Sequence, residues 1–484
     1  METPSDSPRY PLIDTGPSAT PLGALRVREA GQITRLAWPT VLAMLSHTFM
    51  WLVDSALLGR YATVDLAASG LGGVVTWTAY SLFNNLSRIN GTFVSQAHGK
   101  GDDRAIGDYT WQGLYVAVAC GLLLQAGGYV ADHILSWTRN DPDVIEHAYV
   151  YIKWRTASAV FTQVGFCLMG FFQGRRDVMV PMWAGIIGNG LNVVLDLWLI
   201  FGWTGFDLAG RTWLAVPAMG VEGAAIATSV GTAVSALYQL AWLFGPREHR
   251  RRFAIHRPRR PDWRQLGRIV RVGSPAAFEN FVDMSGFTAF MIIVGTLGAA
   301  AQAANTIAMH MLSLVFMPMW GLTIAGSVLT GNWIGAGRAD QAAAYARQVY
   351  KLGLYYMVTL GLVYLAVGGR MFVIFSTDPA VLALGGSLMT VMAVFQLPDG
   401  LRMVSVGVLQ GAGDTRYPML ASLAVLWLVF VPVTLWIVAV KGAGVTGAWL
   451  GATACYALLA AVLYGRFRSD RWQQARIFGD EPAP

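Results

Sequence analysis

The sequence is poor in charged side chains, which make up only 13% of its 484 residues. Soluble domains carry about 25% charged residues, so this chain lacks the charge that a water-exposed surface of its length needs. Disordered chains combine high charge with few hydrophobic residues, whereas 55% of the residues here are hydrophobic. The composition therefore excludes a disordered chain and argues against a soluble cytosolic enzyme.

Cysteines and catalytic motifs are also scarce. The three cysteines, Cys120, Cys167 and Cys455, show no CxxC spacing, which argues against a disulfide framework and a cysteine metal site. The sequence has no Walker-type phosphate loop, so we expect no ATP hydrolysis. It also shows no clustered nucleophile, metal ligands or acid–base set. We therefore predict that the chain is not an enzyme and needs no cofactor.

Long hydrophobic runs are abundant. A helix of about 20 apolar residues crosses the roughly 30 Å hydrocarbon layer, and glycine is enriched in such helices while tryptophan is enriched at the membrane interfaces. The chain holds 54 Gly and 18 Trp, and it has twelve apolar blocks. We predict an all-α integral membrane protein with transmembrane helices near residues 34–58, 64–95, 109–135, 144–171, 178–202, 219–244, 272–296, 302–333, 343–374, 381–409, 417–440 and 443–465.

The positive charges predict the orientation of these helices. Ten arginines fall between Arg247 and Arg271, where a cytosolic loop explains them better than a nucleic-acid surface. With the N-terminus inside, the inner segments carry 25 Lys and Arg and the outer loops carry five. Lys and Arg concentrate on the cytoplasmic side of membrane proteins. We therefore expect both termini in the cytoplasm, a location in the bacterial inner membrane, the lipid bilayer as partner and no nucleic-acid partner.

The second half of the chain repeats the first. Gly99-Lys100-Gly101 aligns with Gly335-Ala336-Gly337, and after a single register shift the motif that begins at Gln173 aligns with the one at Gln410. In the shifted register Asp141-Pro142 aligns with Asp378-Pro379, and we expect each Asp to cap a helix that begins at the Pro. Each copy holds six predicted spans. Because six is an even number, both copies have the same orientation in the membrane, and an axis along the membrane normal relates them. This predicts two pseudo-symmetric six-helix lobes of a secondary transporter.

We divide the chain accordingly into five segments. They are a cytosolic N-terminal tail, an N-terminal lobe, a basic cytosolic linker, a C-terminal lobe and a cytosolic C-terminal tail, at residues 1–33, 34–245, 246–271, 272–466 and 467–484.

Polar residues inside the first-half spans mark one candidate site. Ionisable groups in the hydrocarbon region cost about 2.5–3.5 kcal/mol or more and are functional candidates by default. Asp54 lies in the first span, while Asn189, Asn192 and Asp196 share one face of the fifth. Carboxylate and amide oxygens can bind a hard cation such as Na⁺, and a desolvated Asp can bind a proton. The stripe favours a cation site over simple helix packing and leaves Na⁺ or H⁺ open.

The second half carries three further acids inside predicted spans. Glu279 and Asp283 lie four residues apart on one face of the seventh span, where two carboxylates repel unless a proton or cation joins them. Asp399 lies between Pro398 and Gly400, where we expect a broken helix that lines a cavity. In the alternative interpretation, Asp399 is only neutralised by Arg402 three residues later.

One cation also lies inside a predicted span. Arg88 follows Asn84 by four residues in the second span, and an acid elsewhere in the lobe is its expected partner.

Several motifs together resemble the multidrug and toxic compound extrusion (MATE) family. They are Val53-Asp54-Ser55 with Asp65-Leu66-Ala67-Ala68, Val94-Ser95-Gln96-Ala97-His98-Gly99, Gly170-Phe171-Phe172-Gln173-Gly174, Gly273-Ser274-Pro275 with Glu279-Asn280, and Leu409-Gln410-Gly411-Ala412-Gly413-Asp414. The resemblance covers about residues 34–465. No single motif is diagnostic, but the occurrence of all of these motifs in this order on twelve spans is specific.

This resemblance implies a V-shaped pair of lobes that exports organic cations and drugs in exchange for Na⁺ or H⁺. The NorM-like and DinF-like branches carry a cation site to which Asp54, Asn192 and Asp196 correspond, with Thr228 as the matching sixth-helix threonine. Asp283 and Asp399 fit acidic positions of the second lobe in NorM-like members. Many of those members have Glu where Asp283 stands, and Glu279 is additional. The resemblance also leads us to expect a monomer.

A lipid-linked saccharide flippase of the same superfamily is the alternative. It would be expected to have a cationic central cavity and often extra spans, whereas embedded acids dominate this sequence and it has twelve spans.

Overall fold

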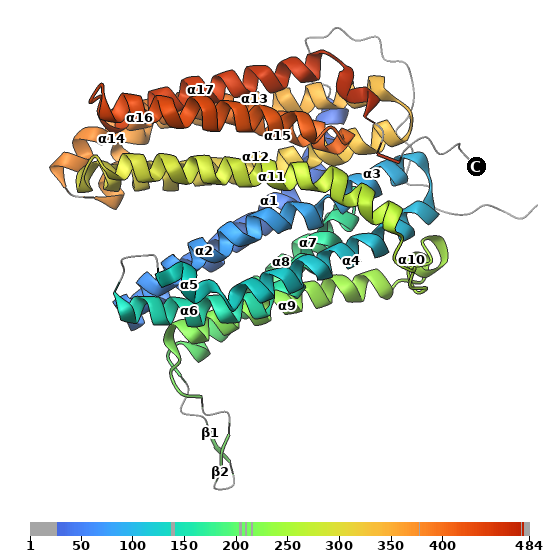
Figure 1. Cartoon of the computed structure of the whole chain (residues 1–484), viewed down its shortest axis with the longest axis horizontal. Coiled ribbons are helices and arrows are strands. Elements are labelled where there is room, and N and C mark those ends of the chain that lie inside the picture. Colours follow the sequence, from blue (N-terminus) through green and yellow to red (C-terminus); the bar gives the residue numbers. More distant parts are fainter. Residues whose placement is uncertain are drawn as a thin grey trace, which may run out of the picture.

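Two bundles of helices meet at one end of the molecule and diverge toward the other (Figure 1). The computed structural model describes residues 27–136, 141–202, 206–208, 211–213, 216–376, 378–475 and 477–478. Residues 1–26 of the predicted N-terminal tail and residues 479–484 of the C-terminal tail lie outside the described residues. The fold is the predicted all-α architecture of two six-helix lobes.

The N-terminal lobe is built from the helices α1 to α9, and some consecutive pairs of these helices together form a single span. The helices are α1 (Val27–Tyr61), α2 (Thr63–Arg88), α3 (Asn90–Lys100), α4 (Asp103–Gly128), α5 (Ala131–Ser136), α6 (Pro142–Ala157), α7 (Ala159–Gly174), α8 (Met179–Leu199) and α9 (Gly220–Phe244). A short antiparallel hairpin, β1 (Phe206–Leu208) and β2 (Arg211–Trp213), connects α8 to α9. The hairpin projects from the end where the lobes diverge, which we call the hairpin end (Figure 1).

The C-terminal lobe repeats this plan after the short helix α10 (Arg247–Arg252). Its elements are α11 (Trp263–Gly295), α12 (Ala299–Gly335), α13 (Ala339–Phe375), α14 (Pro379–Ala412), α15 (Arg416–Ser422), a π-helical segment (Leu423–Phe430), α16 (Val431–Ala439), α17 (Gly444–Arg468) and a 3₁₀ turn (Arg471–Gln474). The predicted linker 246–271 thus contains α10 and the first turns of α11.

Each of the twelve predicted spans coincides with one helix or with consecutive helices. Within the described residues, nine helical segments are long and apolar enough to cross a membrane, and two bent segments raise the number to eleven. The bends are 49° between α6 and α7 and 42° within α12. The remaining predicted span is α4, whose 26 residues begin with the charged Asp103 and Arg104.

The repeated Asp-Pro pair caps helices as predicted. The Asp141 carboxylate accepts a hydrogen bond from the backbone N–H of Asp143, and α6 begins at Pro142. In the other lobe, the Asp378 carboxylate accepts from the N–H of Ala380, and α14 begins at Pro379. Proline fits the first helical position because its missing N–H would have no partner there.

The predicted break at Pro398 is wrong. Helix α14 runs without interruption from Pro379 to Ala412. A proline inside a helix removes one backbone hydrogen bond, but the hydrogen bonds on both sides continue, and neighbouring helices support proline within membrane helices. Among the described residues of this lobe, the irregular backbone lies instead in the π-helical segment before Pro432 and at the bend within α12.

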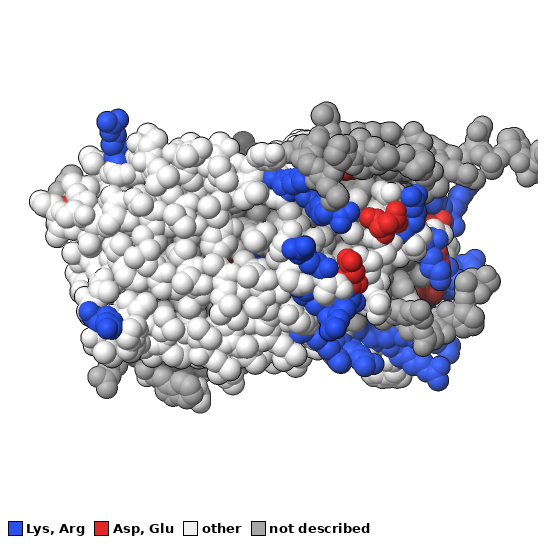
Figure 2. Space-filling view, turned by 90° about the horizontal axis from the view of Figure 1, so that it is seen from above, with Lys and Arg blue, Asp and Glu red and all other residues white. Residues whose placement is uncertain are grey.

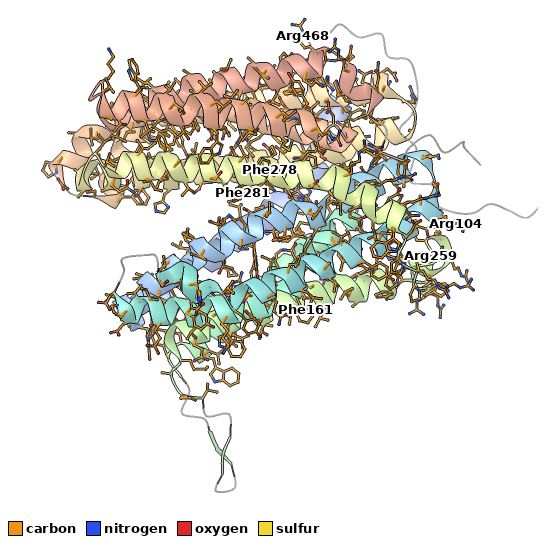
Figure 3. All side chains as sticks on the ribbon, in the orientation of Figure 1. Arg104, Phe161, Arg259, Phe278, Phe281 and Arg468 are labelled. Carbon is orange, nitrogen blue, oxygen red and sulfur yellow. The ribbon has the colours of Figure 1, made fainter. Side chains whose placement is uncertain are left out.

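Positive side chains gather at the end where the lobes meet, which we call the basic end (Figure 2). Figure 3 places Arg104, Arg259 and Arg468 there. Two ion pairs join the segment between the lobes to α4: Arg252 Nε lies 3.0 Å from Asp103 Oδ2, and Arg259 Nε lies 2.7 Å from Asp108 Oδ1.

The two lobes interlock at the basic end through reciprocal contacts. Gln96 on α3 donates hydrogen bonds of 3.1 and 3.0 Å to the carbonyls of Gly411 and Ala412 in the C-terminal lobe. Asn332 on α12 donates bonds of 3.1 Å to the carbonyls of Ser95 and Gly174 in the N-terminal lobe. Gln96 and Asn332 are equivalent positions of the sequence repeat, so the contact follows the pseudo-two-fold axis.

Two glycines allow this close approach. A Cβ atom at Gly99 would clash with the carbonyl of Asn332, and one at Gly335 would clash with the carbonyl of Gln96. These two glycines are also equivalent positions of the repeat. The glycine motifs of the repeat therefore form the surface on which the lobes close.

Candidate functional site

The first candidate site lies inside the N-terminal lobe, where three helices bring four polar side chains together. Asp54 comes from α1, Asn192 and Asp196 from α8, and Thr228 from α9. All four are buried, and Asn192 and Asp196 are 0% exposed. Asn192 and Asp196 share a face because they lie one helical turn apart.

Thr228 connects the members of this site. Its hydroxyl oxygen accepts a hydrogen bond of 3.2 Å from the Asn192 side-chain N–H. The same hydroxyl lies 3.5 Å from Asp54 Oδ2 and 2.9 Å from the carbonyl of Ala224, to either of which it can donate its single hydrogen. The sequence resemblance had assigned this threonine to the site, and the structure places it between the other members.

Most oxygens of the site have no donor. Asp54 Oδ1, Asn192 Oδ1 and both carboxylate oxygens of Asp196 are buried without a hydrogen-bond partner in the described part of the chain. The carboxyl groups of Asp54 and Asp196 also lie within hydrogen-bonding reach of each other. Two carboxylates so close repel each other unless a proton or cation lies between them. The arrangement can therefore bind a small cation or a proton.

Asn189, the third residue of the predicted stripe on α8, lies outside this site. The Asn189 amide donates a hydrogen bond of 2.8 Å to the hydroxyl of Ser46 on α1. This is a packing contact between two helices of the kind common in membrane proteins. Only two of the three stripe residues therefore join the site.

Sequence reasoning missed Arg155 on α6. This arginine interacts electrostatically with Asp54, and its Nη1 is buried without a hydrogen-bond partner among the described residues. In the sequence it lies near the middle of the predicted span 144–171 and shares no motif with the other members of the site. No spacing in the sequence could reveal this interaction, because Asp54 and Arg155 lie on different helices, α1 and α6, whose arrangement is set only by the folded lobe.

The second candidate site lies in the C-terminal lobe and contains three acids around one arginine. Arg402 on α14 is 5% exposed, and its Nη2 lies 2.9 Å from Asp399 Oδ1. Its Nη1 lies 3.3 Å from Asp283 Oδ1 and 3.9 Å from Glu279 Oε1, both on α11. The alternative predicted for Asp399, a pair with Arg402, is therefore present, but the arginine is shared by all three acids.

Two further side chains complete this cluster. The Ser422 hydroxyl donates a hydrogen bond of 3.2 Å to Glu279 Oε1, and the Tyr456 hydroxyl lies 3.5 Å from Asp283 Oδ1. The Arg402 guanidinium also lies 5.4 Å from the centre of the Tyr456 ring, within the range of a cation–π contact. Three acids and one arginine leave an excess of acidic groups even after the ion pairs form.

Comparison with known proteins identifies the family. The family model described as MatE matches residues 39–198 and 275–436, which together make up more than half of the chain and fall in the two lobes. The chain belongs to the MATE family.

Relatives of this MATE protein cover almost its whole length. The chain is 27% identical over 455 residues to the probable multidrug resistance protein NorM of Thermotoga maritima, which covers 93% of this chain and 94% of that protein. It is 30% identical over 447 residues to the multidrug resistance protein NorM of Burkholderia vietnamiensis, covering 91% and 94%. These matches make it a NorM-like member of the family.

Solved structures share the fold of this MATE protein. A crystal structure of MATE in complex with MaL6 superposes with a TM-score of 0.80 at 21% identity and covers 92% of this chain and 98% of that one. An outward-facing multidrug resistance MATE family transporter gives a TM-score of 0.81 at 20% identity, covering 92% and 97%.

Proposed function

We propose that this MATE transporter is a secondary active antiporter that exports drugs and organic cations in exchange for Na⁺ or H⁺. The observation that carries the proposal is the set of buried oxygens without donors at Asp54, Asn192 and Asp196, within the described part of the chain. A buried charge without a partner is costly, so a site of this kind binds an ion that can leave again. The names of the NorM relatives, multidrug resistance proteins, support drug export.

In this proposal, ion entry is coupled to drug export because the ion and the drug weaken each other's binding to the transporter. In the proposed cycle, Na⁺ or H⁺ binds at Asp54, Asn192, Asp196 and Thr228 in the outward-facing state and drives drug release. The inward-facing state binds drug and releases the ion to the cytoplasm. A ligand shifts this equilibrium only through different affinity for the two states, so ion and drug must weaken each other's binding.

The proposed orientation places the basic end in the cytoplasm and both termini with it, in the bacterial inner membrane. The distribution of 25 inner and five outer Lys and Arg residues supports it. The lobes diverge toward the hairpin end (Figure 1), so this orientation makes the structure outward-facing. We propose that the protein acts as a monomer, because each chain carries both lobes.

The second-lobe acids Glu279, Asp283 and Asp399 are proposed to attract cationic substrates. Arg402 compensates only part of their charge. Asp283 is the most exposed of the three, with 15% of its side chain accessible, and is therefore the best placed to meet a substrate.

Transport by purified protein in proteoliposomes with imposed Na⁺ or pH gradients tests the proposal. Wild-type protein should move ethidium against its gradient with one of the two ions, and Asp54→Asn should abolish that dependence. Glu146→Gln is the matched control, since Glu146 is an exposed acid on α6. Undiminished, gradient-driven transport by Asp54→Asn at equal protein levels would remove Asp54 from the coupling site.

A further inference from the structure

Arg88 and Lys153 are cations of the N-terminal lobe that make no ion pair with the described residues. Arg88 on α2 lies at the junction of the lobes, 5.5 Å from the centre of the Trp320 ring, so the expectation of an acid as its partner is wrong. Lys153 lines a different pocket, which lies between α4 and α6. A lysine in a membrane span is costly unless its amine reaches the headgroups or a partner. Lys153 therefore needs one of the two.

The pocket lies near the headgroup level toward the hairpin end. Gln125 in its lining follows Asp108 by 17 residues on α4, which is about 26 Å along a helix. Asp108 pairs with Arg259 at the basic end (Figure 3), and the hydrocarbon layer is roughly 30 Å thick. Tyr129 and Trp154 also line the pocket, and these residue types are enriched at membrane interfaces.

The surface around the pocket faces the bilayer. Gln125 lies on a stripe of α4 with steps of three or four residues. The other members of this stripe, Val118, Leu122 and Tyr129, are 38%, 54% and 65% exposed. Toward the hairpin end, α2 lies between these helices and the C-terminal lobe (Figure 1), so the stripe is on the outer side of its lobe.

Packing fixes the walls of the pocket. The Trp154 indole N–H donates a hydrogen bond of 3.0 Å to Glu222 Oε1 on α9, which holds the ring in place. Helices α4 and α6 touch at Gly128, where a Cβ atom would clash with Thr156 Oγ1. The cavity volume of about 110 Å³ has room for several water molecules, and therefore for a phosphate group.

Two polar side chains of the lining have no partner among the described residues. Lys153 makes no side-chain hydrogen bond or ion pair to them, and the Gln125 amide makes no hydrogen bond to them. The part of the lining that the structure describes also contains no acid. A lysine ammonium binds phosphate as a point charge, and an amide N–H donates to phosphate oxygens. The lining thus matches a phosphate and not a cation.

The sequence repeat does not require this lysine. In the register that pairs Asp141 with Asp378, Lys153 corresponds to Thr390 in the C-terminal lobe. The Thr390 hydroxyl donates a hydrogen bond of 3.0 Å to the carbonyl of Gly386 in its own helix. The cation is therefore a feature of the N-terminal lobe and not of the common helix plan.

We propose that this pocket binds the phosphate of an anionic phospholipid in the leaflet at the hairpin end, with Lys153 as charge partner and Gln125 as donor. The acyl chains then follow Val118 and Leu122 toward the middle of the bilayer. Because the lining offers no acid to pair with the amine of a zwitterionic headgroup, phosphatidylglycerol binds better than phosphatidylcholine. The lipid is a bound partner and not a transported substrate.

Native mass spectrometry of the purified full-length protein in detergent tests this site. The protein is titrated with phosphatidylglycerol, with phosphatidylcholine and with diacylglycerol of the same acyl chains, which lacks the phosphate. Wild type is compared with Lys153→Gln, Lys153→Arg and Gln125→Leu. Lys441→Gln is the matched control, since Lys441 is an exposed lysine outside this pocket whose amine lies 5.0 Å from the centre of the Trp436 ring.

Wild type should bind one phosphatidylglycerol about fivefold or more tightly than either other lipid. Lys153→Gln should remove this preference, while Lys153→Arg should keep it because the charge remains. Gln125→Leu removes one donor and should weaken phosphatidylglycerol binding about threefold. It also serves as the second variant if Lys153→Gln fails to fold. Lys441→Gln should leave all three affinities unchanged.

Three outcomes would overturn the proposal. An unchanged preference in Lys153→Gln would remove this lysine from the site, and equal affinity of wild type for diacylglycerol would mean that only acyl chains bind. If inorganic phosphate displaces phosphatidylglycerol at equal concentration, the pocket binds a free anion and not a lipid. Binding is measured without an ion gradient, so none of these results depends on the antiport proposal.

Discussion

The two acidic sites differ in what compensates their charge. In the N-terminal lobe, Asp54 and Asp196 adjoin each other, and three of their four oxygens have no donor among the described residues. In the C-terminal lobe, three acids surround Arg402, which lies 2.9 to 3.9 Å from each of them. Arg402 forms ion pairs with the acids of its lobe, whereas Arg155 acts on Asp54 without an ion pair among the described residues. This difference is consistent with the proposal that the N-terminal site binds an ion from solution.

This difference arose within a duplicated chain. In the register that pairs Gly99 with Gly335, Asp54 corresponds to Phe290 and Glu279 to Ala43, so neither site is a copy of the other. Phe290 is fully buried and packs edge-on against Trp449, with ring centres 4.7 Å apart. The position that holds a buried acid in one lobe thus belongs to an aromatic core in the other. The repeat conserved the backbone plan while the polar interior diverged.

Among the substitutions that test this difference between the lobes, removal of the Arg402 side chain should have the largest effect, which is a loss of stability. Arg402→Gln leaves three buried acids without their cation, and breaking a buried ion pair costs about 3–5 kcal/mol. We expect a much lower thermal unfolding temperature in detergent and a low yield of folded protein. The double variant Arg402→Gln with Asp399→Asn should recover part of the stability. Wild-type stability of the single variant would mean that Arg402 does not hold the cluster together.

Neutralisation of Asp196 should affect function without this loss of stability. Asp196→Asn removes one of two adjoining carboxyl groups, so repulsion falls and the unfolding temperature should stay the same or rise. Transport driven by the coupling ion should fall at least tenfold in proteoliposomes. A large drop in stability instead would mean that Asp196 is needed for folding, and the two lobes would then use their acids alike.

Replacement of Thr228 by valine should have an intermediate effect. The substitution keeps the side-chain shape and removes the hydroxyl that contacts Asn192 and Asp54. A neutral hydrogen bond contributes about 0.5–1.5 kcal/mol, so the apparent affinity for the coupling ion should fall about threefold to tenfold. The ion concentration that gives half-maximal transport measures this change, and Thr232→Val on the same helix is the control.

Removal of the Tyr456 hydroxyl should have the smallest effect. Its distance of 3.5 Å from Asp283 Oδ1 indicates a weak hydrogen bond, and Tyr456→Phe retains the ring beneath Arg402. We expect a loss of less than about 1 kcal/mol and transport within twofold of wild type. A larger loss of transport with unchanged stability would place the hydroxyl among the groups that act on the substrate.

The sequence predicts the spans because each needs only its own hydrophobic run, and it predicts the caps because Asp141 and Asp378 act on adjacent residues. It predicts Asn192 and Asp196 as neighbours because they share one helix. It cannot show that Arg402 forms ion pairs with acids on α11 or that Arg155 interacts with Asp54. Nor can it show that Arg88 has no acidic partner among the described residues. Each of these contacts depends on how separate helices pack. At Pro398 local propensity misled, since neighbouring helices preserve a helix through a proline.

The interlocked surface at the basic end bears on how such a protein could originate. Each lobe carries both halves of the contact: an amide on Gln96 or Asn332 and the carbonyl acceptors of Gly174 or Gly411. A single lobe is therefore self-complementary and could pair with a second copy of itself about a true two-fold axis, as symmetric dimers do. In this chain the gene duplication has made that symmetry internal, and each lobe's interior became free to change alone.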